Sequence, residues 1–89
     1  MKKIKKIAIV FSATRKTDKI LVEAREIIKQ ADSELVCIVN VNQIRSSDLN
    51  KISKADLILV FGGDGTMIGS IRSLHSLNIP FLGVNSGTV

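Results

Sequence analysis

The hydrophobic residues of this 89-residue chain gather in four short runs, at residues 7–11, 35–39, 57–61 and 79–84, the last interrupted by Pro80. Within each run, polar residues do not alternate with apolar ones. Runs of this kind are typical of strands that are buried on both faces of a parallel sheet. We therefore predict a strand at each of the four runs.

Between the first two runs, apolar residues recur with the spacing of one helical face. The apolar positions that share one helical face are Ile20, Leu21, Ala24, Ile27, Ile28 and Ala31. Thr17 is a suitable N-cap for this helix, and Asp18 would place an acid in its first turn, where the helix dipole favours negative charge.

Two further helices are predicted downstream. Ser46 or Ser47 could cap a short helix before the third run. After that run, four spaced apolar residues mark another helix, namely Ile68, Ile71, Leu74 and Leu77. Asn78 suits a left-handed cap at its end, and Pro80 prevents continuation of the helix.

The alternation of strands and helices predicts one α/β domain over residues 1–89, with three αβα layers and a mainly parallel sheet of about four strands. In such Rossmann-like sheets, ligands bind beyond the carboxyl ends of the strands, near the point where the strand order reverses. The loops that matter are therefore residues 12–17, residues 62–66 and the segment that begins at Asn85.

Charge and composition narrow the class of ligand. The net charge is +5, and four lysines lie within the first six residues. A basic surface suits anionic ligands, although we interpret these lysines mainly as a solvated tail beside the first strand. The chain has no Trp and no Tyr, and its three Phe lie in apolar runs. Because binding to nucleic-acid bases calls for aromatic stacking surfaces, we predict no nucleic-acid partner.

Cys37 is the one cysteine, and it lies inside the second apolar run. It can form no disulfide within the chain, so we interpret it as a small core residue. The apolar run that follows the N-terminal lysines is too short for a signal peptide, and no stretch approaches the ~20 apolar residues of a membrane span. We expect a soluble, cytoplasmic protein without a membrane partner.

The segment Gly62-Gly63-Asp64-Gly65-Thr66 follows the third predicted strand and opens a helix. Glycines let the backbone turn sharply and approach a ligand closely. Free N–H groups at a helix N-terminus attract phosphate, and the Thr66 hydroxyl can donate to a phosphate oxygen. The loop therefore predicts a phosphate-binding site.

Asp64 is the unusual member of this loop, because a carboxylate beside phosphates is repelled unless it binds a proton or a metal ion. It could act as a general base on a substrate hydroxyl or as a ligand of Mg²⁺. The alternative is structural, with Asp64 merely capping the helix.

Other phosphate-binding motifs do not match. The chain has no P-loop sequence, and Gly63, Gly65 and Gly69 are spaced one residue too long for the dinucleotide fingerprint. Residues 12–17 faintly resemble a flavodoxin loop, but Arg15 replaces its glycine and the aromatic residues that would hold a flavin are missing. We interpret this segment as a polar loop, in which Thr14, Arg15 and Lys16 could still assist phosphate binding.

Two motifs together resemble those of NAD kinases. The first is Gly62 to Thr66 with the helix that it opens, and the second is Gly83-Val84-Asn85-Ser86-Gly87-Thr88. Diacylglycerol and sphingosine kinases and phosphofructokinases carry related Gly-Gly-Asp-Gly-Thr loops. The second motif favours NAD kinase, because Asn85 precedes Gly87 here. The resemblance is specific over residues 62–88.

The resemblance implies phosphorylation of the adenosine-ribose 2′-hydroxyl of NAD to NADP, with ATP or polyphosphate as donor and a divalent metal ion such as Mg²⁺. It implies that Asp64 is the general base, that Gly62 and Gly65 contact nucleotide, that Gly63 and Thr66 help to hold phosphate, and that Asn85 lies nearby. It assigns no metal ligand among these residues and no role to Arg72 or His75, both of which we expect to be exposed.

The family also places an Asn-Glu pair and most NAD contacts on a second, β-rich domain, which these 89 residues do not include. We therefore expect this chain alone to be inactive. As a separate expectation, the full-length protein forms a homo-oligomer. A noncatalytic nucleotide-binding module and another kinase of the superfamily stay open as alternatives. NAD or NADH preference is also open.

Overall fold

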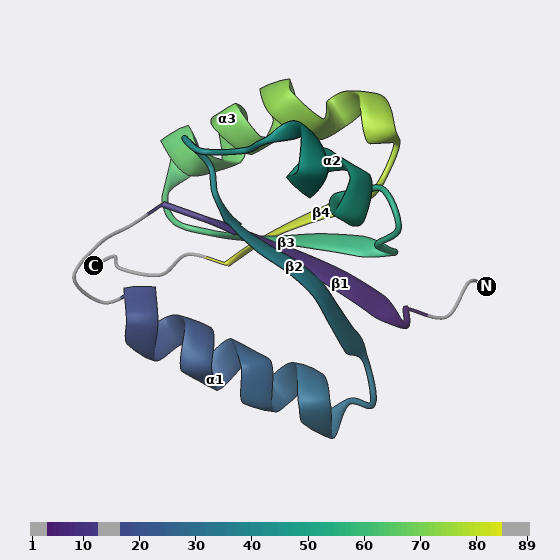
Figure 1. The fold of residues 1–89 in the computed structure, drawn as a ribbon. Helices are drawn as coiled ribbons and strands as arrows, with labels where there is room; N and C mark the ends of the chain where they lie inside the picture. Colours follow the sequence, from purple (N-terminus) through teal and green to yellow (C-terminus); the bar gives the residue numbers. More distant parts are fainter. Residues whose placement is uncertain (1–3, 13–16, 85–89) are drawn as a thin grey trace.

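Strands and helices alternate along the chain, as the computed structural model shows for the residues it describes, 4–12 and 17–84 (Figure 1). The four strands are β1 (Lys6–Phe11), β2 (Glu34–Asn40), β3 (Leu57–Phe61) and β4 (Phe81–Val84). The helices are α1 (Thr17–Gln30), α2 (Ser46–Ile52), α3 (Asp64–Leu74) and the short 3₁₀ helix η1 (His75–Leu77).

All four strands are parallel and lie in the order β2-β1-β3-β4. The chain moves outward from β1 to β2 and then returns to the other side of β1, so the order reverses between β1 and β3. At the carboxyl ends, one row of paired residues crosses the whole sheet, in the order Asn40, Phe11, Phe61 and Val84. This row marks the edge at which we expect ligands.

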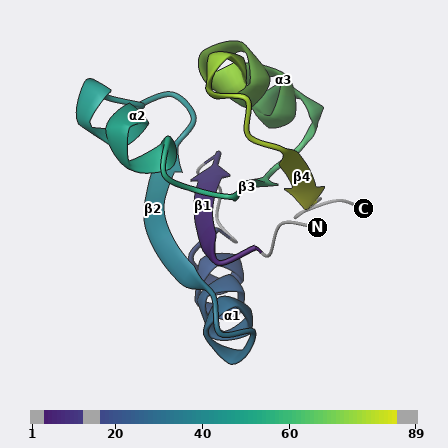
Figure 2. The same cartoon turned by 90° about the vertical axis from the view of Figure 1, so that its right-hand side faces the viewer.

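Helices cover both faces of the sheet. Helix α1 lies on one face, whereas α2 and α3 lie together on the other (Figures 1 and 2). The predicted three-layer αβα fold with a four-stranded parallel sheet is therefore confirmed. Among the described residues, no helix is both long and apolar enough to cross a membrane.

Each face of the sheet has its own hydrophobic cluster. Along β1, Ile7 and Ile9 pack toward α1 with Ala24 and Ile28, whereas Ala8 and Val10 pack on the other side. Successive side chains of a strand point to opposite faces, so a strand buried on both sides needs an unbroken apolar run. This is the physical reason for the uninterrupted runs in the sequence.

Strand β2 departs from regular pairing. Ile7 pairs with Leu35, but the next residue of β1, Ala8, pairs with Cys37. The extra residue, Val36, forms a bulge, and both Val36 and Cys37 pack against the cluster on the α2 and α3 side. The interpretation of Cys37 as a packed residue agrees with this position, although its side chain is only partly buried.

Helix α1 ends at Gln30, so the predicted face residue Ala31 lies in the turn that follows and is exposed. The buried face of α1 also differs in part from the prediction. Ala24 and Ile28 are buried and Leu21 packs against the same cluster, whereas Ile27 is 66% exposed. The prediction for Ile27 is wrong because α1 covers a narrow strip of the sheet, and position 27 lies beside the buried stripe rather than on it. The capping side chains predicted at Thr17 and Asp18 lie outside the described part of the structure.

The buried face of α3 also differs from the prediction. Thr66, Ser70 and Leu74, spaced four residues apart, face the sheet, whereas Ile68 and Ile71 are 55% and 42% exposed. A buried serine is tolerated here because its hydroxyl donates to the Thr66 carbonyl oxygen at 2.7 Å. Small and backbone-bonded residues therefore let α3 approach the sheet, and two of the predicted core isoleucines face outward.

The ends of the other helices and strands agree only in part with the predicted ones. Helix α2 is capped by Arg45 rather than by Ser46 or Ser47, because the Asp48 carboxylate accepts the Arg45 N–H at 2.9 Å. Asn78 adopts the predicted left-handed conformation, with φ of 56°. Strand β4 begins at Phe81 rather than Ile79, since Pro80 has no N–H for the ladder.

Candidate functional site

Residues 62–66 connect the end of β3 to α3 beside the row that closes the sheet (Figure 1). Gly62 has φ of 150°, a conformation that side chains disfavour. Its N–H donates to the Val84 carbonyl at 3.3 Å, which ties the loop to β4. Gly63 is the N-cap of α3, and its carbonyl accepts hydrogen bonds from Thr66 and Met67. The backbone therefore turns at Gly62, and α3 begins two residues later, at Asp64.

The three glycines of this loop differ in whether packing requires the absence of a side chain. A Cβ on Gly62 would lie 2.5 Å from the Thr66 hydroxyl oxygen and 2.8 Å from the Thr66 Cβ, so the fold itself requires glycine there. A Cβ on Gly63 or Gly65 would meet no other described part of the chain within 4 Å, apart from neighbouring backbone. Neither residue has a positive φ. Packing among the described residues therefore does not explain glycine at positions 63 and 65.

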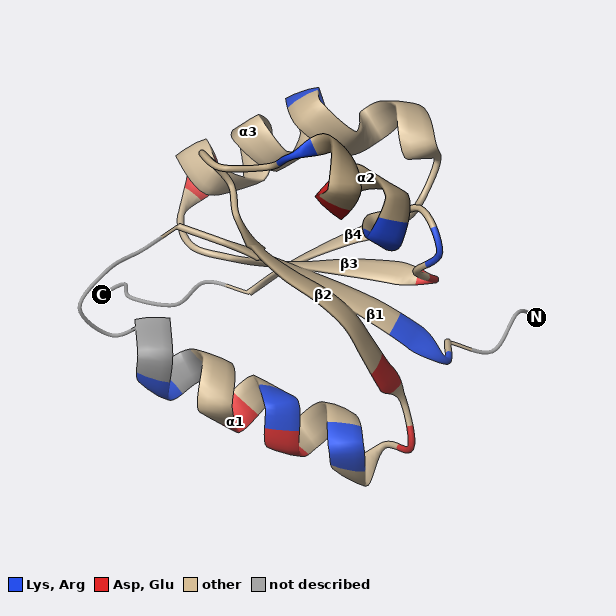
Figure 3. Ribbon diagram, in the orientation of Figure 1, with Lys and Arg blue, Asp and Glu red and all other residues tan. Residues whose placement is uncertain are grey.

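Asp64 is the first residue of α3, and its side chain is exposed. The N-cap is Gly63, and no side-chain hydrogen bond caps the helix. The interpretation of Asp64 as a simple helix cap is therefore wrong. Figure 3 shows this acid at the start of a helix whose other charge, at Arg72, lies in the last turn.

The Thr66 side chain lies on the buried side of the loop rather than on its exposed side. Its side chain is 8% exposed and packs against Gly62. The described geometry thus gives Thr66 a structural role in shaping the turn, and the phosphate contact expected from its hydroxyl stays a prediction.

A cavity of about 180 Å³ lies between this loop and the end of β4. Its lining comes from both predicted motifs and the strand and helix beside them, namely Val60, Gly62, Gly63, Asp64, Met67, Gly83 and Val84. A Cβ on Gly83 would approach the Met67 methyl group to 2.5 Å, so this glycine leaves room for the methionine side chain. The fold therefore brings together residues that are about twenty positions apart in the sequence.

Several predicted residues cannot be placed. Asn85 lies outside the described residues, as do Thr14, Arg15 and Lys16. Ser12 is described, and its N–H donates to the Phe61 carbonyl at 3.2 Å. The segment that follows β1 therefore starts next to the Gly62 turn. Arg72 and His75 are exposed, as expected.

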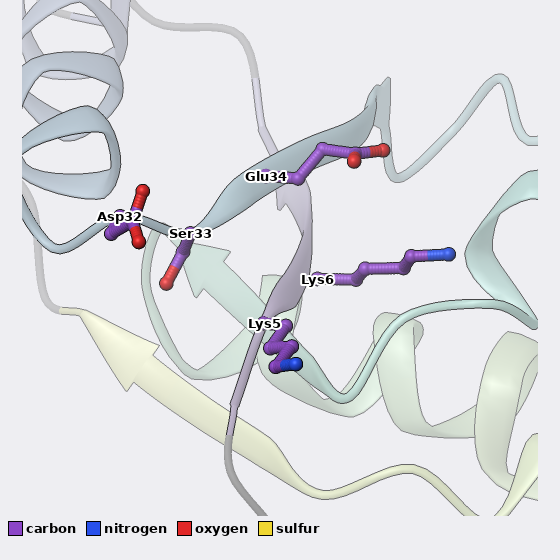
Figure 4. A pocket seen from close by; sticks show the side chains of 5 residues that line it. All are labelled: Lys5, Lys6, Asp32, Ser33 and Glu34. Atoms are coloured by element: carbon purple, nitrogen blue, oxygen red, sulfur yellow. The ribbon is translucent and has the colours of Figure 1, made fainter.

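A larger cavity, of about 460 Å³, lies at the opposite end of the sheet (Figure 4). It is lined by Lys5, Lys6, Asp32, Ser33 and Glu34. Figure 4 shows these side chains at the start of β1 and the residue before it, at the start of β2, and on the turn that precedes β2. Acids and bases are mixed there, and the cavity is at the amino ends of the strands, whereas parallel sheets bind ligands at the carboxyl ends. The smaller cavity beside Asp64 is therefore the candidate site.

Asp64 belongs to no carboxylate cluster within residues 4–12 and 17–84. The described part of the chain contains no group of three or more His, Cys, Asp or Glu side chains that could hold a metal ion. Mg²⁺ is commonly bound through one or two carboxylates together with substrate phosphates, rather than by a cage of protein ligands. A single exposed carboxylate in a glycine-rich loop, as at Asp64, fits that mode.

Comparisons with known proteins identify the family. A family model described as the ATP-NAD kinase N-terminal domain matches residues 8–89. The NAD kinase of Rickettsia bellii is 36% identical over 66 residues, covering 64% of this chain and 26% of that protein. The NAD kinase of Helicobacter pylori is 46% identical over 44 residues, covering 49% of this chain and 16% of that protein.

The NAD kinase of a Marinomonas species is 29% identical over 68 residues, which cover 75% of this chain and 23% of that protein. The chain thus spans at most 26% of the length of these three relatives. No solved structure matches it. With a family model that covers almost the whole chain, this protein belongs to the ATP-NAD kinase family and carries its N-terminal domain.

Proposed function

We propose that this chain is the nucleotide-handling part of a kinase that phosphorylates the adenosine-ribose 2′-hydroxyl of NAD with ATP, giving NADP. One observation carries the proposal beyond family membership. Beside an exposed acid, the loop has glycine at two positions, 63 and 65, where described packing does not call for it. Missing side chains at those positions let the backbone N–H groups approach phosphate.

In this proposal Asp64 accepts the proton of the ribose 2′-hydroxyl. The hydroxyl oxygen bonds to the γ-phosphorus of ATP, the bond from that phosphorus to the β–γ bridging oxygen breaks, and ADP leaves. Catalysis of phosphoryl transfer rests mainly on positioning and on stabilising charge. In this proposal Gly62 fixes the turn, and Gly63 and Gly65 leave space on its exposed side. Helix α3 directs the positive end of its dipole toward the phosphates. Thr66 and Asn85 belong to the same proposed site.

Mg²⁺, when bound, would neutralise phosphate charge, and Asp64 is the described carboxylate that could contact it at this loop. The two roles for Asp64 differ in their expected metal response. A lost metal ligand is partly compensated by a higher Mg²⁺ concentration, whereas a lost general base is not.

The decisive experiment measures NADP formation from NAD, ATP and Mg²⁺ by the native-length protein and by its Asp64→Asn variant. We expect the variant to lose at least about 10²-fold in kcat, the scale of a lost general base. Glu26→Gln removes an exposed acid from the distant helix α1 and serves as the control, with unchanged activity. No NADP from a folded wild-type protein would contradict the proposal and direct attention to lipid or sugar-phosphate acceptors. Cytoplasmic location and homo-oligomeric assembly stay predictions.

A further inference from the structure

The side chain of Met67 connects the beginning of α3 with strand β4. The Met67 N–H donates to the Gly63 carbonyl at 3.2 Å, so this residue lies near the start of the helix. Its methyl group reaches Gly83, where an added Cβ would lie 2.5 Å from it. Figure 2 shows α3 on the β3–β4 side of the sheet, with β4 below it. The loop and β4 are therefore joined by a side-chain contact as well as by the hydrogen bond between Gly62 and Val84.

This contact, rather than the backbone conformation, explains glycine at position 83. Gly83 does not have a positive φ. Within the described part of the chain, and apart from its sequence neighbours, the Met67 methyl carbon is the one atom within 4 Å of a Cβ at this position. An alanine there would therefore conflict only with the tip of a flexible side chain. Because methionine has three rotatable bonds and adapts its shape readily, we expect Gly83→Ala to fold and the methyl group to move.

The surroundings of Met67 favour one direction for that movement. Met67 is partly buried and packs against the hydrophobic cluster on the α2 and α3 side, which includes Val60 and Leu74. Both of these side chains are almost fully buried, and a close-packed interior has no room for a displaced methyl group. Met67 also lines the cavity beside Asp64. A Met67 side chain that is pushed away from β4 therefore enters this cavity.

We propose that Met67 sets the width of the cavity beside Asp64, and that glycine at position 83 keeps the Met67 methyl group against β4 and outside the space for the nucleotide. The inference rests on the proposed function, since it takes nucleotide binding at this cavity from there. Met67 is a positioning residue in this inference, because its thioether shapes the space beside the acid and exchanges no proton. A cavity of about 180 Å³ has room for about six waters, so a displaced thioether would occupy a large part of it.

The test measures NAD affinity by calorimetric titration of the native-length protein, because the proposed function brings the NAD ribose to Asp64. We expect Gly83→Ala to raise the Kd of NAD at least about tenfold without a change in melting temperature. Steady-state NADP formation should show the same rise in KM for NAD, with kcat changed by less than about threefold, since lost space weakens ground-state and transition-state binding alike.

A second substitution tests whether Met67 causes the loss. Leucine has as many side-chain heavy atoms as methionine but lacks the terminal methyl carbon that meets position 83, so Met67→Leu preserves the packed volume. We expect the double variant, Gly83→Ala with Met67→Leu, to bind NAD within about threefold of the wild type. Rescue of this kind is not expected if Gly83 merely stabilises the strand.

Gly69→Ala is the matched control. A Cβ on Gly69 would also approach a side chain, the Val41 Cγ2 at 3.3 Å, but Gly69 does not line the cavity beside Asp64. We expect this variant to bind NAD as the wild type does. A comparable loss in Gly69→Ala would mean that any added methyl group near α3 disturbs the site, which contradicts a specific role of Met67.

The inference is also overturned if a folded Gly83→Ala protein binds NAD as the wild type does, if the double variant stays as weak as the single one, or if Gly83→Ala unfolds. In these cases NADP formation by the wild type leaves the proposed function intact. If NAD affinity falls and recovers as expected but no NADP forms, the role of Met67 is supported and the kinase activity is contradicted. A wild type that binds no NAD contradicts both.

Discussion

At Gly62 the backbone conformation and the packing of Thr66 both exclude a side chain, whereas Gly65 faces open space. We predict that Gly62→Ala lowers the free energy of unfolding by about 1–3 kcal/mol, because it combines a disfavoured φ with a contact of 2.5 Å. Gly65→Ala, within α3, should instead raise stability by about 0.5–1 kcal/mol.

Denaturant titration of both variants separates fold from function. Gly65→Ala should remain folded while losing nucleotide affinity, since its methyl group occupies the space proposed for the ligand. Similar stability losses in both variants would contradict this division of roles. Unchanged nucleotide affinity in a folded Gly65→Ala protein would argue against a close approach of ligand at that residue.

Cys37 provides a prediction on pH. Burial raises the pKa of its thiol above the ordinary value of 9.0, the Asp48 carboxylate raises it further, and Lys51 partly offsets the rise. The folded state therefore keeps its proton at pH values where the unfolded state has lost it. The stabilising contribution is complete below about pH 9 and is lost as the pH rises through the folded-state pKa.

The measurement compares unfolding free energies of wild type and Cys37→Ala from pH 7 to pH 10.5. Their difference should be constant at low pH and should shift against the wild type above about pH 9. A difference that is flat throughout would show that the thiol titrates alike in both states.

At the scale of elements, the turn after α1 shows how a helix ends without glycine. Asp32 has φ of 60°, its N–H donates to the Lys29 carbonyl, and the Ser33 N–H donates to the Ile28 carbonyl, both at 3.1 Å. This is the Schellman arrangement, in which glycine is the preferred residue at the left-handed position. Figure 4 shows Asp32 and Ser33 in this turn.

We predict that Asp32→Gly raises the free energy of unfolding by about 1 kcal/mol, because glycine adopts the left-handed conformation without steric cost. Ala31→Gly, one residue earlier and without a positive φ, is the matched control and should lower it. Thermal denaturation of the two variants measures whether their free energies of unfolding change in these opposite directions. A loss of stability in Asp32→Gly would show that the carboxylate contributes more than the strained backbone costs.

For the whole molecule, Asp56 links the beginnings of two strands. Its Oδ2 accepts the N–H groups of Lys5 and Lys6 at 2.9 and 3.0 Å, and its own N–H donates to the Lys6 carbonyl at 2.7 Å. These bonds join positions fifty residues apart and secure the amino end of β1 against the start of β3.

We predict that Asp56→Ala lowers the free energy of unfolding by about 1–3 kcal/mol, since two backbone donors lose a charged acceptor. Asp56→Asn keeps one acceptor oxygen and should lose less. Urea titration distinguishes the two variants, and equal losses would mean that the carboxylate charge, rather than the acceptor geometry, is responsible. Exposed Lys54→Ala, two residues away, should have little effect.

The sequence by itself determined the αβα architecture, since apolar runs such as residues 7–11 can only be buried between two helical layers. It also determined the turn chemistry at Asn78 and the glycine-rich entry to α3. These features depend on local sterics and on hydrophobic periodicity, and both are set by residues that are close together in the sequence.

Only the tertiary structure decided which face of α3 is buried, because the bonded Ser70 hydroxyl and the packing of Thr66 outweighed the isoleucine periodicity. It also decided that Gly62 serves the fold while Gly63 and Gly65 do not, and that Gly83 and Val84 line one cavity with Gly62 and Asp64. Strand order and the direction of a side chain depend on contacts between distant residues, and no local pattern encodes them.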